Sequence, residues 1–242
     1  MPLVKLDATT STNDFLKNLA ADPATENYTI VTAERQSNGR GQMGSSWVSE
    51  AGKNLMMSIL IKGMLTDASQ LFSLNVAVAL AVVECLEKHD IPALSIKWPN
   101  DILSGAKKIG GILIENSFKS ESQIVSIVGL GLNINQQDFT GLPKAGSLHT
   151  VTDRFFDKEM IRDQVADTII RNVNFLDEHS EILWDSYHTR LFKIGVPMPF
   201  EDADQNRFMG IIKNVTRDGK LELLVDDDSV KSFAIKEIQM LY

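Results

Sequence analysis

The chain has a single cysteine, Cys85, among its 242 residues. One thiol excludes an internal disulfide, and no group of cysteines and histidines has the spacing of a zinc site. The N-terminus lacks the basic-then-apolar pattern of a secretory signal, and no apolar run approaches the roughly 20 residues that span a bilayer. We therefore expect a cytoplasmic protein with no membrane partner.

Positive charge is also scarce. The sequence has 24 Lys and Arg against 32 Asp and Glu, a formal net charge of −8 at pH 7. Its basic residues form no run dense enough to follow a phosphate backbone, so we expect no nucleic-acid partner. The length of 242 residues suits one sizeable domain and a small second one.

Hydrophobic patterns predict an α/β fold. Apolar and β-branched runs bounded by polar turns predict strands at 28–33, 54–62, 94–98, 107–115 and 122–134. Apolar residues at helical spacing predict helices at 69–89 and 160–183, and Ser11 is expected to cap a short helix that ends near residue 19. Cys85 falls on the apolar stripe of the first long helix, which favours a core residue over a catalytic thiol.

The pattern changes after Gly195. Short strand-like runs follow one another at 208–215, 221–225 and 232–235, which is typical of a small β-barrel-like module. We therefore expect two domains, residues 1–194 and 195–242.

A glycine-rich segment follows the predicted strand 28–33. Gly39, Gly41 and Gly44 have the G-x-G-x-x-G spacing of a dinucleotide-binding turn, but that turn must open a helix, and the next residues have no helical pattern. The segment is better interpreted as a flexible loop that closes over a ligand, with Arg40 as a cation and Trp47 as a stacking surface. A plain surface loop is the alternative.

The hairpin at 107–134 carries a second group of glycines. If residues 116–123 close its loop, Gly110 faces Gly129 and Lys108 faces Gly131. Glycine inside a strand often marks the close approach of a ligand, so this face is expected to form the floor of a slot for a molecule with an apolar body and an anionic head. β-bulges and a solvent-exposed lysine are the alternative. The expected face carries Lys108, Gly110, Ile112, Ile114, Val125, Ile127, Gly129, Gly131 and Asn133.

The stretch KWPND ends the predicted strand 94–98. Pro99 fixes a turn there, so Asn100 and Asp101 are expected to project beyond the edge of the sheet. Asn can bind an adenine edge and Asp can hold Mg²⁺. Ordinary turn chemistry explains the same residues.

Five motifs together resemble the biotin protein ligases, the biotin-[acetyl-CoA-carboxylase] ligases. They are STN at 11–13, RQSNGRGQMGSSW at 35–47, KWPND at 97–101, KKIGGILIE at 107–115 and GLGLNIN at 129–135. The resemblance implies a mixed α/β catalytic domain related to class II aminoacyl-tRNA synthetases and an SH3-like C-terminal domain. It also implies ATP-dependent activation of biotin to biotinyl-5′-AMP and transfer of biotin to one lysine of a carrier protein.

The resemblance also implies roles for particular residues. Lys108 and Arg40 would be catalytic, Trp47, Asn100 and Asn133 would contact the nucleotide, and Asp101 would hold Mg²⁺. The implied partner is a biotin carboxyl carrier protein or a biotin-accepting carboxylase domain, with a homodimer as one option for assembly. The implied biotin-binding residues are Ser11, Thr12, Asn13, Gln36, Gly39, Arg40, Gly41, Gln42, Lys108, Gly110, Gly111, Gly129 and Gly131.

The chain departs from this family in two respects. Many relatives carry arginines in the glycine loop where this chain has Gln42 and Ser45. Some begin with a helix-turn-helix that represses transcription, whereas these motifs start near Met1, so we expect no repressor role.

Three other functions are alternatives to a biotin protein ligase. A lipoate ligase also forms an acyl-adenylate. An octanoyltransferase needs a nucleophilic cysteine, for which Cys85 is badly placed. A non-catalytic module that binds biotin or a carrier protein belongs to a different class.

Overall fold

The computed structural model describes residues 1–65, 67, 70–120 and 123–242. The strands of its larger sheet are β1 (Leu3–Thr9), β2 (Ile30–Gln36), β3 (Leu55–Lys62), β4 (Leu94–Lys97), β5 (Asp101–Ser104), β6 (Lys107–Ser120) and β7 (Gln123–Leu132). The helices are α1 (Thr12–Leu19), the 3-10 turn η1 (Gln42–Gly44), α2 (Leu71–Glu87), α3 (Leu148–Thr152), α4 (Lys158–Asn174) and α5 (Leu176–Thr189). A smaller sheet holds β8 (Pro197–Asp202), β9 (Arg207–Val215), β10 (Leu221–Val225), β11 (Val230–Phe233) and β12 (Ile238–Met240).

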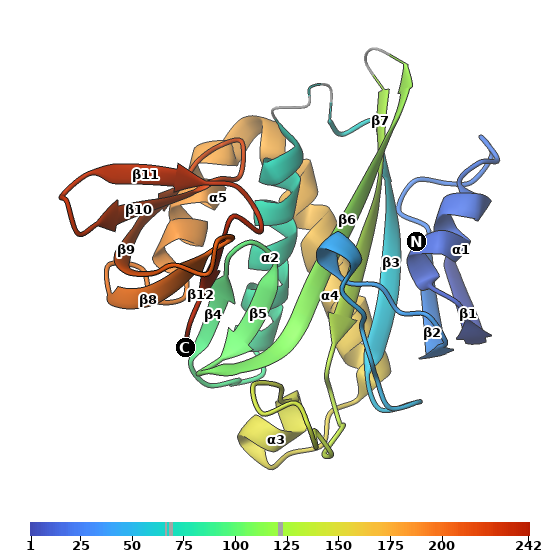
Figure 1. Ribbon diagram of the computed structural model, residues 1–242. Coiled ribbons are helices and arrows are strands. Elements are labelled where there is room, and N and C mark those ends of the chain that lie inside the picture. Colours follow the sequence, from blue (N-terminus) through green and yellow to red (C-terminus); the bar gives the residue numbers. More distant parts are fainter. Residues whose placement is uncertain (66, 68–69, 121–122) are drawn as a thin grey trace.

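The larger sheet is mixed. Its strand order is β1-β2-β3-β7-β6-β5-β4, with β1 and β2 parallel and every other neighbouring pair antiparallel (Figure 1). The smaller sheet is entirely antiparallel, in the order β11-β10-β9-β8-β12. This architecture confirms the α/β fold with a small C-terminal β domain that the sequence predicts.

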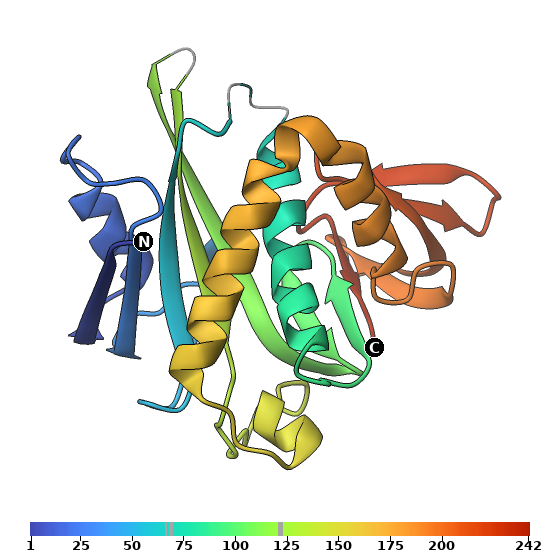
Figure 2. The ribbon, with the colours of Figure 1, turned by 180° about the vertical axis from the view of Figure 1, so that it is seen from behind.

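Helices cover both faces of the larger sheet. α2 and α4 cross one face (Figure 2), and α1 packs on the other against β2, β3 and β7. Leu60 of β3 contacts the α1 side, whereas Ile59 and Ile61 belong to the core under α2. Burial on both faces explains why β3 is an almost continuous apolar run instead of an alternating one.

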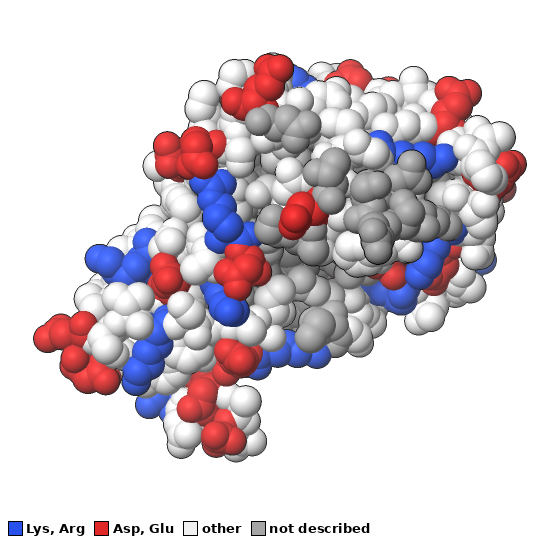
Figure 3. All heavy atoms as spheres, turned by 90° about the horizontal axis from the view of Figure 1, so that it is seen from above, with Lys and Arg blue, Asp and Glu red and all other residues white. Residues whose placement is uncertain are grey.

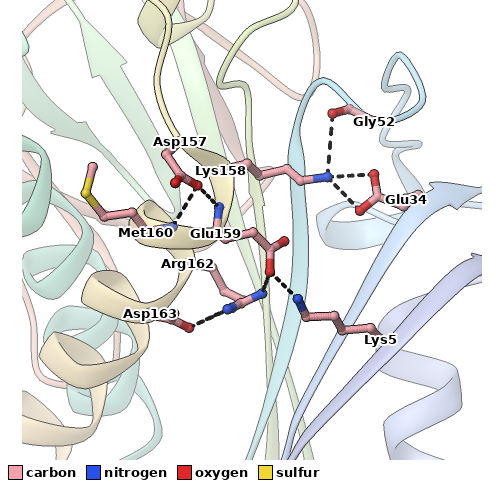
Figure 4. Close-up of polar contacts among 9 residues, drawn as sticks. All are labelled: Lys5, Glu34, Gly52, Asp157, Lys158, Glu159, Met160, Arg162 and Asp163. Atoms are coloured by element: carbon pink, nitrogen blue, oxygen red, sulfur yellow. Dashed lines mark hydrogen bonds and ion pairs between the residues drawn. The ribbon is translucent and has the colours of Figure 1, made fainter.

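The first turn of α4 joins that helix to the edge of the sheet. Asp157 caps the helix by accepting from the backbone N–H groups of Glu159 and Met160 (Figure 4). The Glu159 carboxylate pairs with Lys5 of β1 and with Arg162 one turn along. The parallel edge strand is thereby connected to the helical layer.

Most predicted elements are present, with differences at their ends. Ser11 caps α1, since its Oγ accepts from Asp14 N at 3.4 Å. The long helix predicted at 160–183 is two helices that meet at Phe175. β1, β5, α3, β8 and β12 have no counterpart among the predictions, and the predicted starts at Ser69 and Ser122 lie outside the described residues.

The predicted register of the β6–β7 hairpin is wrong. The strands pair Gly111 with Gly131 and Leu113 with Gly129. The ladder continues to Ser120, so the connection is shorter than expected and the register moves by an odd number of residues, which exchanges the two faces. Gly110 consequently lies on the α2 side, where a Cβ would be 3.1 Å from Leu132 Cδ1 and 3.5 Å from Ile102 Cβ.

The two sheets share one apolar core. The indole nitrogen of Trp98 donates to Gly219 O at 3.0 Å, and Phe200 and Ile212 of the smaller sheet belong to the same cluster as the α2 side chains. The boundary predicted between residues 194 and 195 remains a prediction, because the core is continuous across it. Among the described residues, none of the helices combines the length and the hydrophobicity that a membrane crossing needs.

Charged residues are mixed on the surface seen from above (Figure 3). On this face the described lysines and arginines stand among aspartates and glutamates and do not gather into one patch. The expectation that no nucleic acid is bound remains a prediction.

Candidate active site

Five residues from five strands form one row across the α1 side of the larger sheet. Met56 pairs with Gly131, Gly131 with Gly111, Gly111 with Asp101, and Asp101 with Lys97. At about 4.8 Å between neighbouring strands, the row spans roughly 19 Å. A cleft of about 720 Å³ lies over it, and residues of β8 and β12 complete the wall. The site is therefore elongated across the sheet.

Uncharged polar side chains gather at the β3 end of the cleft. Gln36 Oε1 accepts from Thr12 N at 2.7 Å and lies 3.1 Å from Thr12 Oγ1. Ser58 Oγ lies 2.7 Å from Thr12 Oγ1 and 2.6 Å from Asn13 Oδ1. Thr12 and Asn13 are at the start of α1, directly after the cap Ser11, so the helix terminus positions both. This end suits a neutral group with donors and acceptors.

The glycines of β7 leave room for protein side chains. At Gly129 a Cβ would overlap the amide of Asn13, and at Gly131 it would be 2.5 Å from Cε2 of Trp47. Both glycines line the cleft, and the expectation that a ligand lies directly over them remains a prediction. Asn13 and Trp47 fill that space, and the buried Trp47 Nε1 has no hydrogen-bond partner.

Arg40 is an anchor of the glycine loop. Its Nη2 lies 2.5 Å from Asp14 Oδ1 and 2.8 Å from Glu115 Oε2. These contacts tie the loop to α1 and to β6, and they neutralise the guanidinium. The structure therefore shows Arg40 paired within the protein at the cleft wall, and its contact with a ligand remains a prediction.

The far end of the glycine loop is also fastened. The fully buried Asn54 donates from Nδ2 to Ser49 Oγ at 3.0 Å. Lys158 of α4 contacts Glu34 Oε2 at 2.6 Å and Gly52 O at 3.5 Å (Figure 4). Residues 49–54 therefore form a fixed stem for the loop.

A β-bulge brings Lys108 into the row. Ile102 pairs with Gly110 but Leu103 pairs with Lys108, so one residue of β6 has no partner on β5. Lys108 and Gly111 consequently share a face: a Cβ at Gly111 would be 3.4 Å from Lys108 Cε.

Asp101 lies between two lysines. Lys108 Nζ is 2.5 Å from Asp101 Oδ1, and Lys97 Nζ is 3.8 Å from Asp101 Oδ2. Burial lowers the pKa of Lys97; Asp101 opposes that shift, and the positive charges of Lys108 and Lys144 add to it. This end of the cleft is cationic and suits an anion.

Asp101 does not form a metal site with other side chains. Within the described part of the chain, no three His, Cys, Asp or Glu residues are placed to share a metal ion. A single carboxylate fits Mg²⁺ only where phosphate oxygens and water supply the other ligands.

Most of the predicted site residues line the cleft. Three do not. Gly110 faces α2, and Gly39 lines a neighbouring pocket with Arg40 and Glu115. Asn133 is outside the lining, and its Nδ2 donates to Gly146 O over 2.9 Å. Asn100 is at the cleft wall, but its amide bonds Ile112 O at 2.6 Å. The predicted residues in the lining are Ser11, Thr12, Asn13, Gln36, Arg40, Gly41, Gln42, Trp47, Asn100, Asp101, Lys108, Gly111, Gly129 and Gly131.

Sequence reasoning missed several residues of the site. Ser58 had a visible signal, since it is one polar residue inside the apolar run LMMSILI. Asp14 and Glu115 had none, because their contacts with Arg40 join segments far apart in the chain.

Comparison with known sequences gives a family and several relatives. Residues 6–133 match the Biotin/lipoate A/B protein ligase family. The chain is 29% identical over 246 residues to the bifunctional ligase/repressor BirA of Bacillus subtilis, covering 98% of this chain and 74% of that protein. It is 27% identical over 226 residues to the biotin--[acetyl-CoA-carboxylase] ligase of Mycobacterium tuberculosis, covering 92% of this chain and 83% of that protein.

Solved structures with the same fold extend over nearly the whole chain. The biotin protein ligase of Aquifex aeolicus in complex with biotin and ATP superposes with a TM-score of 0.80 at 24% identity, covering 99% of this chain and 98% of that one. The ligase of Leishmania major in complex with biotinyl-5-AMP gives 0.64 at 22% identity, with 96% and 98% covered. At these identities the superpositions establish the shared fold.

Proposed function

The chain belongs to the Biotin/lipoate A/B protein ligase family, and from this premise we propose that it activates biotin with ATP and transfers the biotinyl group to a lysine of a carrier protein. The observation that carries the proposal is the row across the sheet. The cleft over this row runs from the neutral polar group around Thr12 and Gln36, past Trp47 and Lys108, to the cationic end at Lys97.

Biotin has the same sequence of chemical groups as this row. Its cyclic urea is neutral and both donates and accepts hydrogen bonds, as Thr12, Gln36 and Asn13 do. Its fused ring and chain are apolar and suit the surface of Trp47 and Met56. Its carboxylate is an anion and suits Lys108. A lipoate ring lacks the urea, so the polar end of the cleft favours biotin.

The first step joins two anions. A carboxylate oxygen of biotin attacks the α-phosphorus of ATP, the bond to the β-phosphate oxygen breaks, and pyrophosphate leaves with the electron pair. Lys108 stabilises the charge that develops between the two groups, because its ammonium is held beside Gly111 in the middle of the row. ATP brings Mg²⁺ on its phosphates, and Asp101 is the carboxylate that would hold it there.

The second step consumes the adenylate. The lysine amine of the carrier attacks the acyl carbon, AMP leaves, and the amine loses a proton as the amide forms. Until then the mixed anhydride must be kept from water, and the glycine loop with Trp47 supports that role by covering the middle of the cleft.

The partner and the location are part of the proposal. We propose a biotin carboxyl carrier protein or a biotin-accepting carboxylase domain as the acceptor, in keeping with the names of the relatives. A homodimer and a cytoplasmic location remain predictions from the sequence.

Pyrophosphate release tests the proposal. The protein is incubated with ATP and either biotin, lipoate or octanoate, and then with a purified carrier domain. Release that requires biotin, followed by biotin on one carrier lysine, is the expected result. Release with lipoate alone would make the protein a lipoate ligase. Binding of biotin without turnover of ATP would make it a non-catalytic module, and either outcome overturns the proposal.

A further inference from the structure

The glycine loop has no free cation for the phosphates of ATP. Arg40 is its one basic residue between positions 37 and 52, and that side chain is paired with Asp14 and Glu115. The loop positions that follow Arg40 include the uncharged Gln42 and Ser45. Positive charge for a triphosphate must therefore come from another part of the cleft.

Three lysines from separate segments gather at the cationic end. Lys97 ends β4, Lys108 follows the start of β6, and Lys144 precedes α3. Lys97 Nζ and Lys144 Nζ lie 5.4 and 4.3 Å from the centroid of the Tyr242 ring. The backbone N–H of Lys108 donates to Lys144 O at 2.7 Å, which fixes these two segments side by side. We call Lys97, Lys108 and Lys144 the lysine cluster.

Nearby carboxylates do not balance this charge. Asp101 contacts Lys97 and Lys108, so two ammonium groups share this one carboxylate. Glu201 also lines the cleft, but its Oε2 is 2.9 Å from Arg207 Nε. Asp202 is also in the lining, but among the described residues no ion pair joins it to a lysine of the cluster, and it accepts from the backbone N–H of Asn206 at 2.8 Å in its own turn.

Excess like charge is unfavourable where side chains are partly buried. The Lys97 side chain is 19% exposed, and the lysines on either side of it add repulsion to the cost of desolvation. An arriving polyanion would relieve both, because each ammonium would gain an oxygen partner.

We propose that the lysine cluster is the site for the β- and γ-phosphates of ATP and for the pyrophosphate that leaves, in place of a cation on the glycine loop. The inference rests on the proposed function for the identity of the nucleotide. Lys108 serves both the carboxylate and the phosphates, and Lys97 forms the inner wall; both line the cleft. Lys144 lies just outside that lining, with its ammonium over the Tyr242 ring.

Pyrophosphate itself is the probe. Its dissociation constant for the whole protein is measured by calorimetry for wild type, Lys144→Ala, Lys144→Arg and Lys107→Ala. Lys107 is the matched control, because this neighbouring lysine carries the same charge but its Nζ donates to Pro143 O outside the cluster. Lys144 is exposed, so its replacement should leave the fold intact, which thermal unfolding checks.

The expected result separates the cluster from general surface charge. Lys144→Ala should weaken pyrophosphate binding about tenfold and raise the KM for ATP by a similar factor, with biotin affinity changed less than twofold. Lys144→Arg should keep most of the affinity, and Lys107→Ala should stay within twofold of wild type.

Two outcomes test different statements. Equal pyrophosphate affinity in wild type and Lys144→Ala, or equal losses in Lys144→Ala and Lys107→Ala, would overturn the lysine cluster as the phosphate site. If wild type binds pyrophosphate as expected but forms no biotinyl-5′-AMP, the phosphate site stands and the proposed function fails.

Discussion

The amide of Asn13 occupies the space into which any residue larger than glycine at position 129 would place its side chain. Asn13 Oδ1 lies 2.6 Å from Ser58 Oγ, and Asn13 Nδ2 donates to Glu115 Oε2 at 2.8 Å. The polar end of the cleft therefore depends on the absence of a side chain in a neighbouring strand.

Gly129→Ala should weaken biotin binding at least tenfold. The new methyl group displaces Asn13 and leaves buried polar atoms without partners. In the proposed arrangement ATP binds at the other end of the row, so its affinity should change less than twofold. Calorimetry with each ligand measures both, and normal biotin affinity in a folded variant would show that the position of Asn13 is irrelevant.

Lys108→Ala should lower the rate of adenylation at least a hundredfold. Its ammonium stands in the middle of the row, where the proposed reaction would develop negative charge in the transition state, and losses of this size follow removal of one such group. Its side chain is 36% exposed, so stability should change little. Rapid-quench measurement of biotinyl-5′-AMP gives the rate, with Lys107→Ala as control. A wild-type rate in Lys108→Ala would contradict the assigned role.

Arg40→Gly should make the protein leak its adenylate. Loss of the contacts to Asp14 and Glu115 frees the loop, and glycine adds backbone freedom, so biotinyl-5′-AMP should escape several-fold faster while adenylation slows but continues. The assay is a blot for biotin on an unrelated lysine-rich protein after incubation with biotin and ATP.

Glu115→Gln distinguishes an anchor from a ligand contact. It removes one of the two ion pairs of Arg40, so leakage should lie between wild type and Arg40→Gly. If Glu115→Gln puts no more biotin on the unrelated protein than wild type does, whereas Arg40→Gly puts more, then Arg40 acts on the adenylate directly and not by holding the loop.

Cys85 should be dispensable. Burial in α2 raises the pKa of its thiol to about 11, so below that pH the thiol stays protonated and unreactive in the folded state. Cys85→Ala should keep wild-type adenylation and lose about 1 kcal/mol of stability. The native thiol should react with a disulfide reagent only after unfolding, and loss of activity in a folded Cys85→Ala protein would reopen the thiol-dependent alternative.

Local sequence patterns were enough to predict several elements of residues 1–194. The apolar run of β3, the helical stripe of α2 and the cap Ser11 each depend on neighbouring residues, and all three are present. The single helix predicted at 160–183 was wrong because both halves keep an apolar stripe across the break at Phe175.

Long-range relationships were beyond these patterns. The hairpin register depends on where β6 ends, and the alternation of its residues does not show that end. Lys108 faces the cleft only because of the bulge opposite Ile102 and Leu103. The partners of Arg40 come from α1 and β6, so its role as an anchor becomes visible only in the folded chain.

The stem at 49–54 bears on the entropy of ligand binding. With Asn54 and Lys158 fixing one end of the glycine loop and Arg40 fixing the other, the part between the anchors is confined to residues 41–48, which is itself closed by the backbone hydrogen bonds from Gly41 N to Ser45 O and from Trp47 N to Gly39 O. Ordering a residue costs roughly 1–2 kcal/mol of conformational free energy. Short tethers keep that cost small, so more of the contact energy between loop and ligand remains as affinity.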